Sequence, residues 1–242
     1  FVPPFPDDSG CSLGAAFYVH NQLKNRKKNY ILKTNYLGPH YSDKEIRKIL
    51  IQYKIDHKKS KNITKEVAKL INRGKIIGWF QGGLEFGDRA LGNRSILADP
   101  RDPNMKDKVN KTVKYREEFR PFAPAILAEK VNQYFEKADF TPFMEKTYLI
   151  KKNQRKYIPA VVHVDGSGRL QTVSRNVNPT FHELISEFEK ITKIPIILNT
   201  SFNLKGEPIV CSPTDAIRTF FSSGLDYLIL GSFLIKKQDG DK

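Results

Sequence analysis

The chain has 242 residues, of which 39% are hydrophobic, and this is enough for a sizeable core in one large domain or two small ones. No apolar run approaches the roughly 20 residues that a membrane-spanning helix needs, so we expect no membrane partner. The formal net charge of +15 would suit a nucleic-acid partner if it were spread over the surface.

The positive charge is instead concentrated in residues 21–75, where sixteen Lys and Arg face four Asp and Glu. Aromatic side chains that could stack on bases are sparse in this segment and comprise Tyr30, Tyr36, Tyr41 and Tyr53. We therefore interpret the segment as a solvated, lysine-rich surface, and nucleic acid is not the partner that we expect.

The two cysteines, Cys11 and Cys211, lie far apart and lack metal-ligand spacing, which favours a reducing cytoplasm over a disulfide-stabilised secreted fold. The chain starts with Phe1, and no basic region followed by an apolar stretch indicates a signal peptide. We expect a cytoplasmic chain that is part of a longer protein.

In chain order, a proline-rich opening precedes a predicted helix of small residues at 12–23, which could pack closely on a partner outside this chain. A charged linker at 24–41 is expected to mark a domain boundary. Ser42 and Glu45 have the spacing of a capping box, which predicts a helix with Ile46 and Leu50 facing inward.

A second helix is expected at 64–73, with Gly74 as its C-terminal stop. The short apolar strand at 75–81 follows and leads into a glycine- and arginine-rich loop.

Further along, strands and helices alternate. We expect strands near 147–151, 160–164, 170–174, 194–198 and 227–230. Helices are expected near 104–113, 129–136, 179–191 and 213–222, the last two capped by Asn178 and Ser212. This order predicts an α/β or α+β domain with a mixed sheet.

Four polar, turn-forming stretches lie at the ends of expected strands, where function collects: 85–95, 116–124, 163–175 and 199–210. Arginine occurs in three of them and Lys205 in the fourth. Paired guanidinium N–H groups match phosphate or carboxylate oxygens, so converging arginines indicate a small polyanionic ligand.

A second interpretation is equally compatible with the spacing. Arg89 could pair with Glu85, and Arg116 or Arg120 with the glutamates at 117 and 118, as ordinary surface ion pairs. Neither G-x-x-x-x-G-K-S/T nor G-x-G-x-x-G is present, so side chains would have to hold any phosphate.

Other features have mainly structural interpretations. The run from Asp165 to Gly168 has the composition of a tight hairpin turn between two strands. The histidines show no clustering that predicts a metal site, and each is expected to be structural: His20, His40, His57, His163 and His182.

The four loops closely resemble the C-terminal part of the NodU/CmcH family of O-carbamoyltransferases. The resemblance rests on EFGDRALGNRSILADPRD, REEFRPFAPAIL, HVDGSGRLQTV and LNTSFNLKGEPIVCSPTDAI, in that order, within roughly residues 78–236. Before them, PPFPDDSGCSLGAA is similar to the tail of the family's N-terminal half, an ATPase-superfamily domain of the Kae type.

The resemblance implies a YrdC-like, twisted open mixed sheet with flanking helices for residues 41–242, and a Kae-like remnant with linker for residues 1–40. It also implies that carbamoyl phosphate and ATP form carbamoyl adenylate here. The carbamoyl group would then be transferred to a hydroxyl of a sugar or natural-product acceptor, on the Kae-like domain.

Carried over by motif, Arg89 and Arg120 hold the phosphate-bearing substrate. The implied catalytic residues are Arg89, Arg120, Arg169 and Ser201. The implied substrate- and nucleotide-binding residues are Arg94, Ser95, Asn199, Asn203 and Lys205. Attack on an α-phosphate needs preorganised cations and no side-chain nucleophile, which agrees with these roles. We expect Arg94 to orient the loop and Arg101 to pair with Asp99 or Asp102.

ATP is expected to bring Mg²⁺, for which no clear acidic cluster is visible. Asp8 matches an iron-binding aspartate of the family, but the histidines that join it are not in this chain, so we expect iron only in the full-length protein. The rival hypothesis is a non-catalytic YrdC-like module whose basic segment binds RNA or another polyanion.

Overall fold

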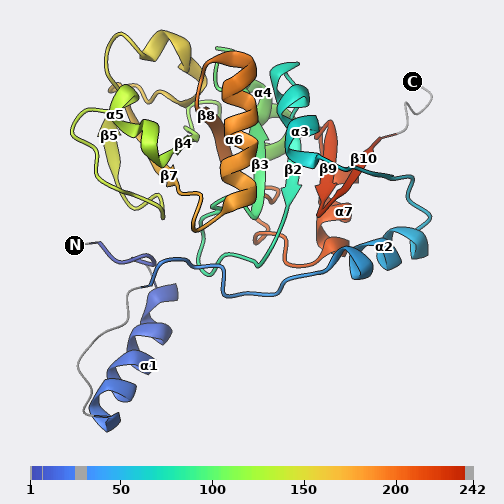
Figure 1. Ribbon diagram of the computed structural model, residues 1–242, viewed down its shortest axis with the longest axis horizontal. Helices are drawn as coiled ribbons and strands as arrows, with labels where there is room; N and C mark the ends of the chain where they lie inside the picture. Colours follow the sequence, from blue (N-terminus) through green and yellow to red (C-terminus); the bar gives the residue numbers. More distant parts are fainter. Residues whose placement is uncertain (1, 7, 25–31, 238–242) are drawn as a thin grey trace.

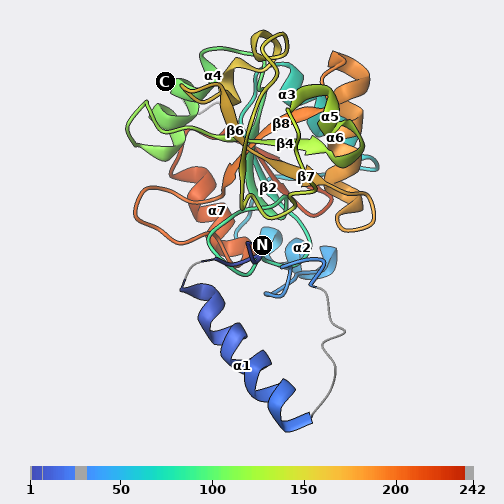
Figure 2. The same cartoon turned by 90° about the vertical axis from the view of Figure 1, so that its left-hand side faces the viewer.

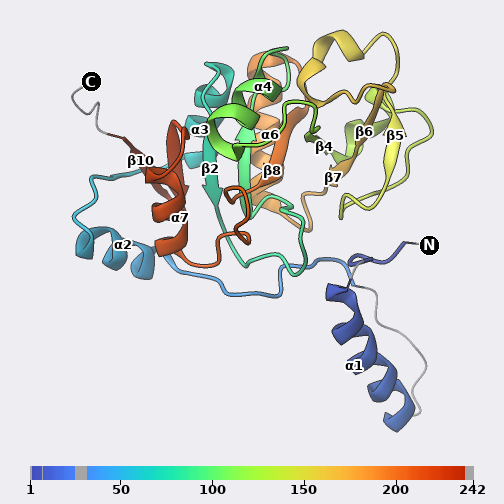
Figure 3. The ribbon, with the colours of Figure 1, turned by 180° about the vertical axis from the view of Figure 1, so that it is seen from behind.

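The computed structural model describes residues 2–6, 8–24 and 32–237 (Figure 1). Helix α1, Ser9–Lys24, projects away from the rest of the molecule in all three views (Figures 1, 2 and 3). It confirms the helix expected at 12–23 and begins three residues earlier. The apolar side chains of Tyr18 and Leu23 are largely exposed on it.

The capping box predicted at Ser42 is confirmed. Helix α2, Asp43–Gln52, starts behind Ser42, whose hydroxyl accepts from the amide of Glu45 while the Glu45 carboxylate accepts from the amide of Ser42. Helix α3, Ile63–Asn72, begins one residue earlier than expected. Its cap is Asn62, whose side chain accepts from the amide of Lys65.

The main sheet of the described residues is mixed and has eight strands. Its order is β1 (Lys58–Lys59), β10 (Phe233–Lys236), β9 (Tyr227–Leu230), β2 (Ile77–Phe80), β3 (Arg94–Ala98), β8 (Ile196–Ser201), β4 (Ala123–Leu127) and β7 (Gln171–Val173). The β2–β9 and β4–β7 pairs are parallel, and the other pairs are antiparallel. The expected mixed sheet is confirmed.

Helices cover both faces of this sheet. Helices α3 and α6 (Pro179–Thr192) pack together on one face (Figure 1), whereas α4 (Met105–Val109) and α7 (Pro213–Phe221) lie on the other (Figure 3). The buried core between these layers is rich in aromatic side chains and includes Trp79, Phe181, Phe188, Phe202 and Phe220. The strand β2 contributes only buried residues, which explains why it appeared in the sequence as a continuous apolar run.

One expected strand is wrong. Residues 160–164 do not pair; the segment contains a 3-10 turn at Pro159–Val161. Pro159 fixes its own φ and lacks an N–H, while Ala160 and Val161 are buried as core residues. A short apolar run does not by itself distinguish a strand from a buried turn.

The helix expected near 104–113 continues from α4 into a wider helical turn, Asn110–Lys114, and stops at Tyr115, where φ is 47°. The helix expected near 129–136 is shorter, a 3-10 turn at Ala128–Lys130 followed by α5, Val131–Tyr134. A further 3-10 turn occupies Arg155–Tyr157.

A small two-stranded sheet stands beside the main one. It pairs β5, Thr147–Leu149, with β6, Ser167–Arg169, so that Thr147 lies opposite Arg169. The predicted turn before β6 is present: Gly166 has φ +80°, and its amide donates to the carbonyl of His163 at 2.8 Å. The strand preceding the turn is missing, so this turn does not form a hairpin; β6 pairs with β5 instead.

Candidate active site

The register of the sheet brings three functional segments together at one end of the inner strands β3, β8 and β4. Ser95, near the start of β3, lies opposite Ser201 at the end of β8. Ala123, at the start of β4, lies opposite Asn199 on the same β8. The loops entering β3 and β4 and the chain leaving β8 therefore meet, and β6 approaches them from the small sheet.

A cavity of about 280 Å³ lies at this end of the strands. Four arginines from three separate segments line it: Arg89, Arg116, Arg120 and Arg169. The rest of its lining consists of Asp88, Ala90, Pro121, Phe122, Met144, Thr147, His163, Thr200 and Ser201. The expected convergence of Arg89, Arg120, Arg169 and Ser201 is thus what the structure shows.

A second cavity, of about 310 Å³, adjoins the first and shares four lining residues with it: Asp88, Arg89, Met144 and Arg169. Its other side is formed by the N-terminal residues Pro4 to Pro6 with Ser9, by Asn35, and by Phe86, Gly87, Phe143 and Glu145. Arg89 and Arg169 therefore stand where the two cavities meet.

The arginine cluster is electrostatically unsatisfied. Burial, and after it the positive charge of Arg89, lower the pKa of Arg169 to about 10. Burial also lowers the pKa of Arg116, with Arg120 acting in the same direction. An anionic ligand between these side chains would relieve that repulsion.

Two of the arginines have carboxylate partners at present. Nη1 of Arg89 lies 2.7 Å from Oδ2 of Asp88, and Nε of Arg120 lies 2.9 Å from Oε2 of Glu117. Arg89 does not pair with Glu85, which was one of the surface ion pairs considered. Both pairs are about half exposed, so their strength is low and a phosphate can replace either carboxylate.

Lys114 fixes the end of β8 through hydrogen bonds from its side chain. Its Nζ donates to the Ser201 carbonyl and to Oδ1 of Asn203, both at 2.6 Å, and reaches Oγ of Ser201 at 3.2 Å. The Ser201 hydroxyl in turn donates to Oδ1 of Asn203 at 2.8 Å. Burial lowers the pKa of Lys114 to about 7.

The loop that carries Arg89 is organised by a buried carboxylate. Oε1 of Glu85 accepts from the amides of Leu91 at 2.7 Å, Asn93 at 2.8 Å and Arg94 at 3.3 Å. Burial raises the pKa of Glu85. These bonds fold residues 85–94 into a tight arc with Arg89 near its middle.

The carbonyls of the same arc are also satisfied by side chains. Tyr36 and Gln171 donate to the Leu91 carbonyl, Trp79 donates to that of Gly92, and Asn199 donates to that of Ala90. The loop is therefore held rigidly on both sides, which preorganises Arg89.

Two predicted ligand residues lie inside the protein. Arg94 is on β3 and fully buried, and its Nη atoms donate to the carbonyls of Gly82, Asn93 and Pro39. Its guanidinium carbon stacks 3.5 Å from the centre of the Phe80 ring. Ser95 is also buried and accepts from the amide of Gly92. Neither lines the arginine cavity, and Arg94 orients the loop as expected.

The remaining predicted residues stand behind or beside the cavity. Asn199 is buried and bonds Ala90 and Gln171, and Asn203 bonds Lys114 and Ser201. Lys205 is exposed and outside the cavity lining. Asp8 is exposed at the start of α1.

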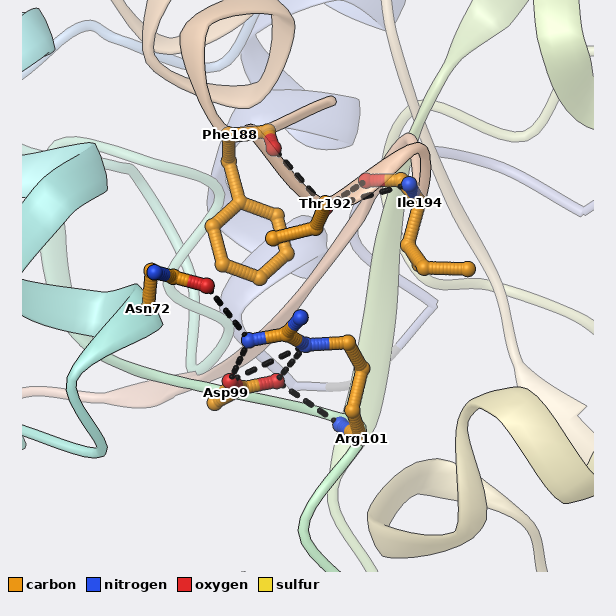
Figure 4. Close-up of polar contacts among 6 residues, drawn as sticks. All are labelled: Asn72, Asp99, Arg101, Phe188, Thr192 and Ile194. Atoms are coloured by element: carbon orange, nitrogen blue, oxygen red, sulfur yellow. Dashed lines mark hydrogen bonds and ion pairs between the residues drawn. The ribbon is translucent and has the colours of Figure 1, made fainter. Parts of the chain in front are cut away.

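Arg101 belongs to the scaffold, as expected. It forms a bidentate pair with Asp99 and donates to Oδ1 of Asn72 at 2.7 Å (Figure 4). Its guanidinium lies over the ring of Phe188, so it ties β3 to α3 and α6.

The sequence did not predict several of the residues that line or support the arginine cavity. Arg116 stood in a quoted motif but was considered only as an ion-pair partner. Asp88 and Thr147 were not considered. His163 was expected to be purely structural, yet it lines the cavity, with Nδ1 3.1 Å from Oγ of Ser167. Lys114 had no local signal, because its burial depends on the distant end of β8.

The described helices include none that is long and apolar enough to cross a membrane. Residues 68–237 match the family model described as the carbamoyltransferase C-terminus. Nodulation protein NolNO of Sinorhizobium fredii is 46% identical over 98% of this chain, and nodulation protein NolO of Bradyrhizobium diazoefficiens is 43% identical over the same share. The chain spans 36% and 44% of the length of these two relatives.

Two solved structures share the fold at low sequence identity. Full-length HypF in a phosphate- and nucleotide-bound form is 18% identical, with a TM-score of 0.51 over 72% of this chain and 25% of that chain. Sua5 of P. abyssi, complexed with L-threonine, is 15% identical, with a TM-score of 0.50 over 70% of this chain and 46% of that chain. These likenesses confirm the expected YrdC-like fold class.

Proposed function

The chain belongs to the carbamoyltransferase C-terminus family, and we propose that it forms carbamoyl adenylate from carbamoyl phosphate and ATP. The observation that carries the proposal is the cluster of Arg89, Arg116, Arg120 and Arg169 around one cavity that opens into another. Two polyanionic substrates need such a site, because their phosphates repel one another unless fixed cations separate them.

The reaction balances with one water. Carbamoyl phosphate gives up phosphate to water, and an oxygen of the resulting carbamate attacks the α-phosphorus of ATP. The bond from the α-phosphorus to the bridging oxygen breaks, and pyrophosphate leaves with that electron pair. The protein has to hold the groups in line and stabilise charge on the phosphoryl oxygens, which fixed guanidinium groups do.

The side chains of the cavity divide this work. Arg89 and Arg169, at the junction of the cavities, contact phosphates of both substrates. Arg116 and Arg120 hold the phosphate of carbamoyl phosphate, and Ser201, fixed by Lys114, orients the carbamoyl group. Asn199 and Asn203 act by positioning Ala90 and Ser201, because neither lines the cavity.

The remainder of the pathway rests on family membership. Transfer of the carbamoyl group to a hydroxyl of a sugar or natural-product acceptor is assigned to the Kae-like domain, of which residues 1–40 are proposed to be a remnant. Iron held there with the help of Asp8 is part of the same proposal.

The test uses the chain with ATP and carbamoyl phosphate, monitoring pyrophosphate and phosphate separately. The proposal predicts release of both in equal amounts, and none when either substrate is omitted. A folded sample that binds nucleotide but releases neither product would refute it. Bicarbonate in place of carbamoyl phosphate serves as the matched control, since the YrdC-like fold alone does not specify the acyl donor.

A second candidate function has one specific observation in its favour. A surface groove of about 540 Å³ beside α2 is lined by four cations, Lys44, Arg47, Lys48 and Lys59, and one carboxylate, Asp43, together with Phe233 and Ile51. This groove suits a polyanion such as RNA. Salt-sensitive RNA binding that survives Arg89→Ala, in a chain that releases no pyrophosphate, would favour this binding module over the enzyme.

A further inference from the structure

The first residues of the loop that carries Arg89 are held by the N-terminal part of the chain. The amide of Phe86 donates to the Asn35 carbonyl at 2.7 Å, and the side-chain amide of Asn35 donates to the Phe86 carbonyl at 3.0 Å. The ring of Phe86 meets that of Phe5 edge-on, with the ring centres 5.1 Å apart. Phe86 is therefore held by two residues that lie outside the segment matched by the family model, residues 68–237.

Phe5 is itself fixed in this position. Its side chain is 7% exposed, whereas Val2, Pro3 and Pro6 in the same stretch are exposed. A Cβ added at Gly10, in the first turn of α1, would lie 2.2 Å from the Phe5 carbonyl oxygen, so the helix packs closely on the Phe5 backbone. The burial of this one ring therefore fixes an otherwise exposed stretch on the arginine loop.

Gly87 is the point at which the loop can bend. Its φ is +106°, a region that glycine enters more readily than other residues. A Cβ added there would lie 3.7 Å from Cδ1 of Phe5, so the same ring also packs on Gly87. Arg89 follows two residues later, and 44% of its side chain is exposed, so contacts of the guanidinium alone do not fix its direction. The bonds to Glu85 fix the chain after Arg89, and the contacts with Phe5 fix it before.

We propose that Phe5 is a positioning residue for adenylate formation. By packing on Phe86 and Gly87, it directs the Arg89 guanidinium to the junction of the two cavities. The proposal rests on the proposed function, in that Arg89 acts there on phosphates. It also makes residues 1–40, expected to be the remnant of another domain, a functional part of this site.

The test is a pair of double-mutant cycles, measured as kcat/KM for pyrophosphate release and as affinity for inorganic pyrophosphate. Phe5→Ala should lower kcat/KM about 10- to 100-fold, because a displacement of about 1 Å can cost that much. It should weaken pyrophosphate binding about tenfold, as expected for loss of one charge-assisted hydrogen bond.

The two backgrounds separate positioning from a general effect on the fold. With Arg89→Ala already present, Phe5→Ala should cost about twofold or less in either measurement, because the group that it positions is gone. With Arg120→Ala present, the full loss should persist, because Arg120 lines the arginine cavity and is absent from the lining that Phe5 shares with Arg89.

The matched control is Val2→Ala, which changes an exposed residue of the same stretch and should behave as wild type. Phe5→Leu keeps most of the apolar volume but loses the ring contact, and should lose about threefold. Thermal unfolding shows whether each variant folds, and Phe5→Leu carries the same cycles if Phe5→Ala does not fold.

Equal losses from Phe5→Ala in the wild-type and Arg89→Ala backgrounds would overturn the proposal, since Phe5 would then act only on the fold in general. Wild-type values in a folded Phe5→Ala variant would overturn it as well. If the wild-type chain releases no pyrophosphate, the proposed function fails. The coupling between Phe5 and Arg89 in pyrophosphate binding then still decides whether Phe5 positions Arg89.

Discussion

The Nζ of Lys114 and Oδ1 of Asn203 lie 2.6 Å apart, at the end of a lysine side chain that is almost completely buried. The same ammonium reaches the carbonyls of Ser201 and Asn203, so one side chain fixes the last residue of β8 and the start of the loop that follows it. This contact connects the folding of the chain to the shape of its arginine cavity.

The burial of Lys114 predicts a specific pH dependence. Its pKa falls from 10.5 to about 7 in the folded chain, so between these values the unfolded chain binds a proton that the folded chain has released. The free energy of unfolding should therefore rise with pH from about 7 towards 10, by at most about 1.4 kcal/mol per unit from this group. Below pH 7 the full cost of burying the charge remains.

Urea unfolding of wild type and Lys114→Met at pH 7, 8 and 9 checks this. The difference between the two proteins isolates Lys114 from other titrating groups. The wild-type free energy should climb relative to the variant, and parallel pH profiles would contradict the assignment.

Glu85 should stabilise the folded chain mainly through the oxygen that accepts hydrogen bonds from three amides, and less through its negative charge. Glu85→Ala leaves three buried amides without an acceptor and should lower the free energy of unfolding by about 3 kcal/mol or more. Glu85→Gln keeps a carbonyl oxygen at the same position and should lose less than half as much. Denaturant unfolding and pyrophosphate binding should follow the same order, and equal losses in both variants would argue against this role.

The arginines at the junction should dominate catalysis. Arg89→Ala and Arg169→Ala should each reduce the rate of adenylate formation about 10²- to 10³-fold, equivalent to about 2.7 to 4 kcal/mol of barrier, by analogy with loss of one oxyanion donor. Arg175→Ala removes an exposed arginine outside the cavity lining and is the matched control. Pyrophosphate release monitors all three. Full activity in Arg89→Ala would exclude that residue from the site.

Gly92 should be intolerant of a side chain. Its φ is +105°, and an added Cβ would overlap ring carbons of Phe181. Gly92→Ala should cost about 3 kcal/mol from backbone strain and overpacking. Gly14→Ala is the control, because nothing lies within 4 Å of its added Cβ and alanine favours the α1 helix. Thermal unfolding compares the two, and similar midpoints would contradict the packing argument.

Local signals in the sequence were sufficient to predict many of the helices and strands. Ser42 with Glu45, and Asn178 or Ser212 before proline, specify helix starts through bonds to residues three positions away, and all three caps are present. Apolar periodicity likewise located α3 and the buried strand β2. The pattern failed at residues 160–164, where a run of the right composition is buried without pairing.

The sequence by itself also determined that arginines collect in polar loops at strand ends, because residue type and loop composition are local properties. It did not show that Arg94, also expected among the ligand-binding residues, is fully buried on β3, whereas Arg89, five residues earlier, lines the cavity. That difference depends on the contacts of Arg94 with Phe80 of β2 and with the carbonyl of Pro39. Only the tertiary structure decided it, together with the burial of Lys114, because both rest on contacts between segments distant in the chain.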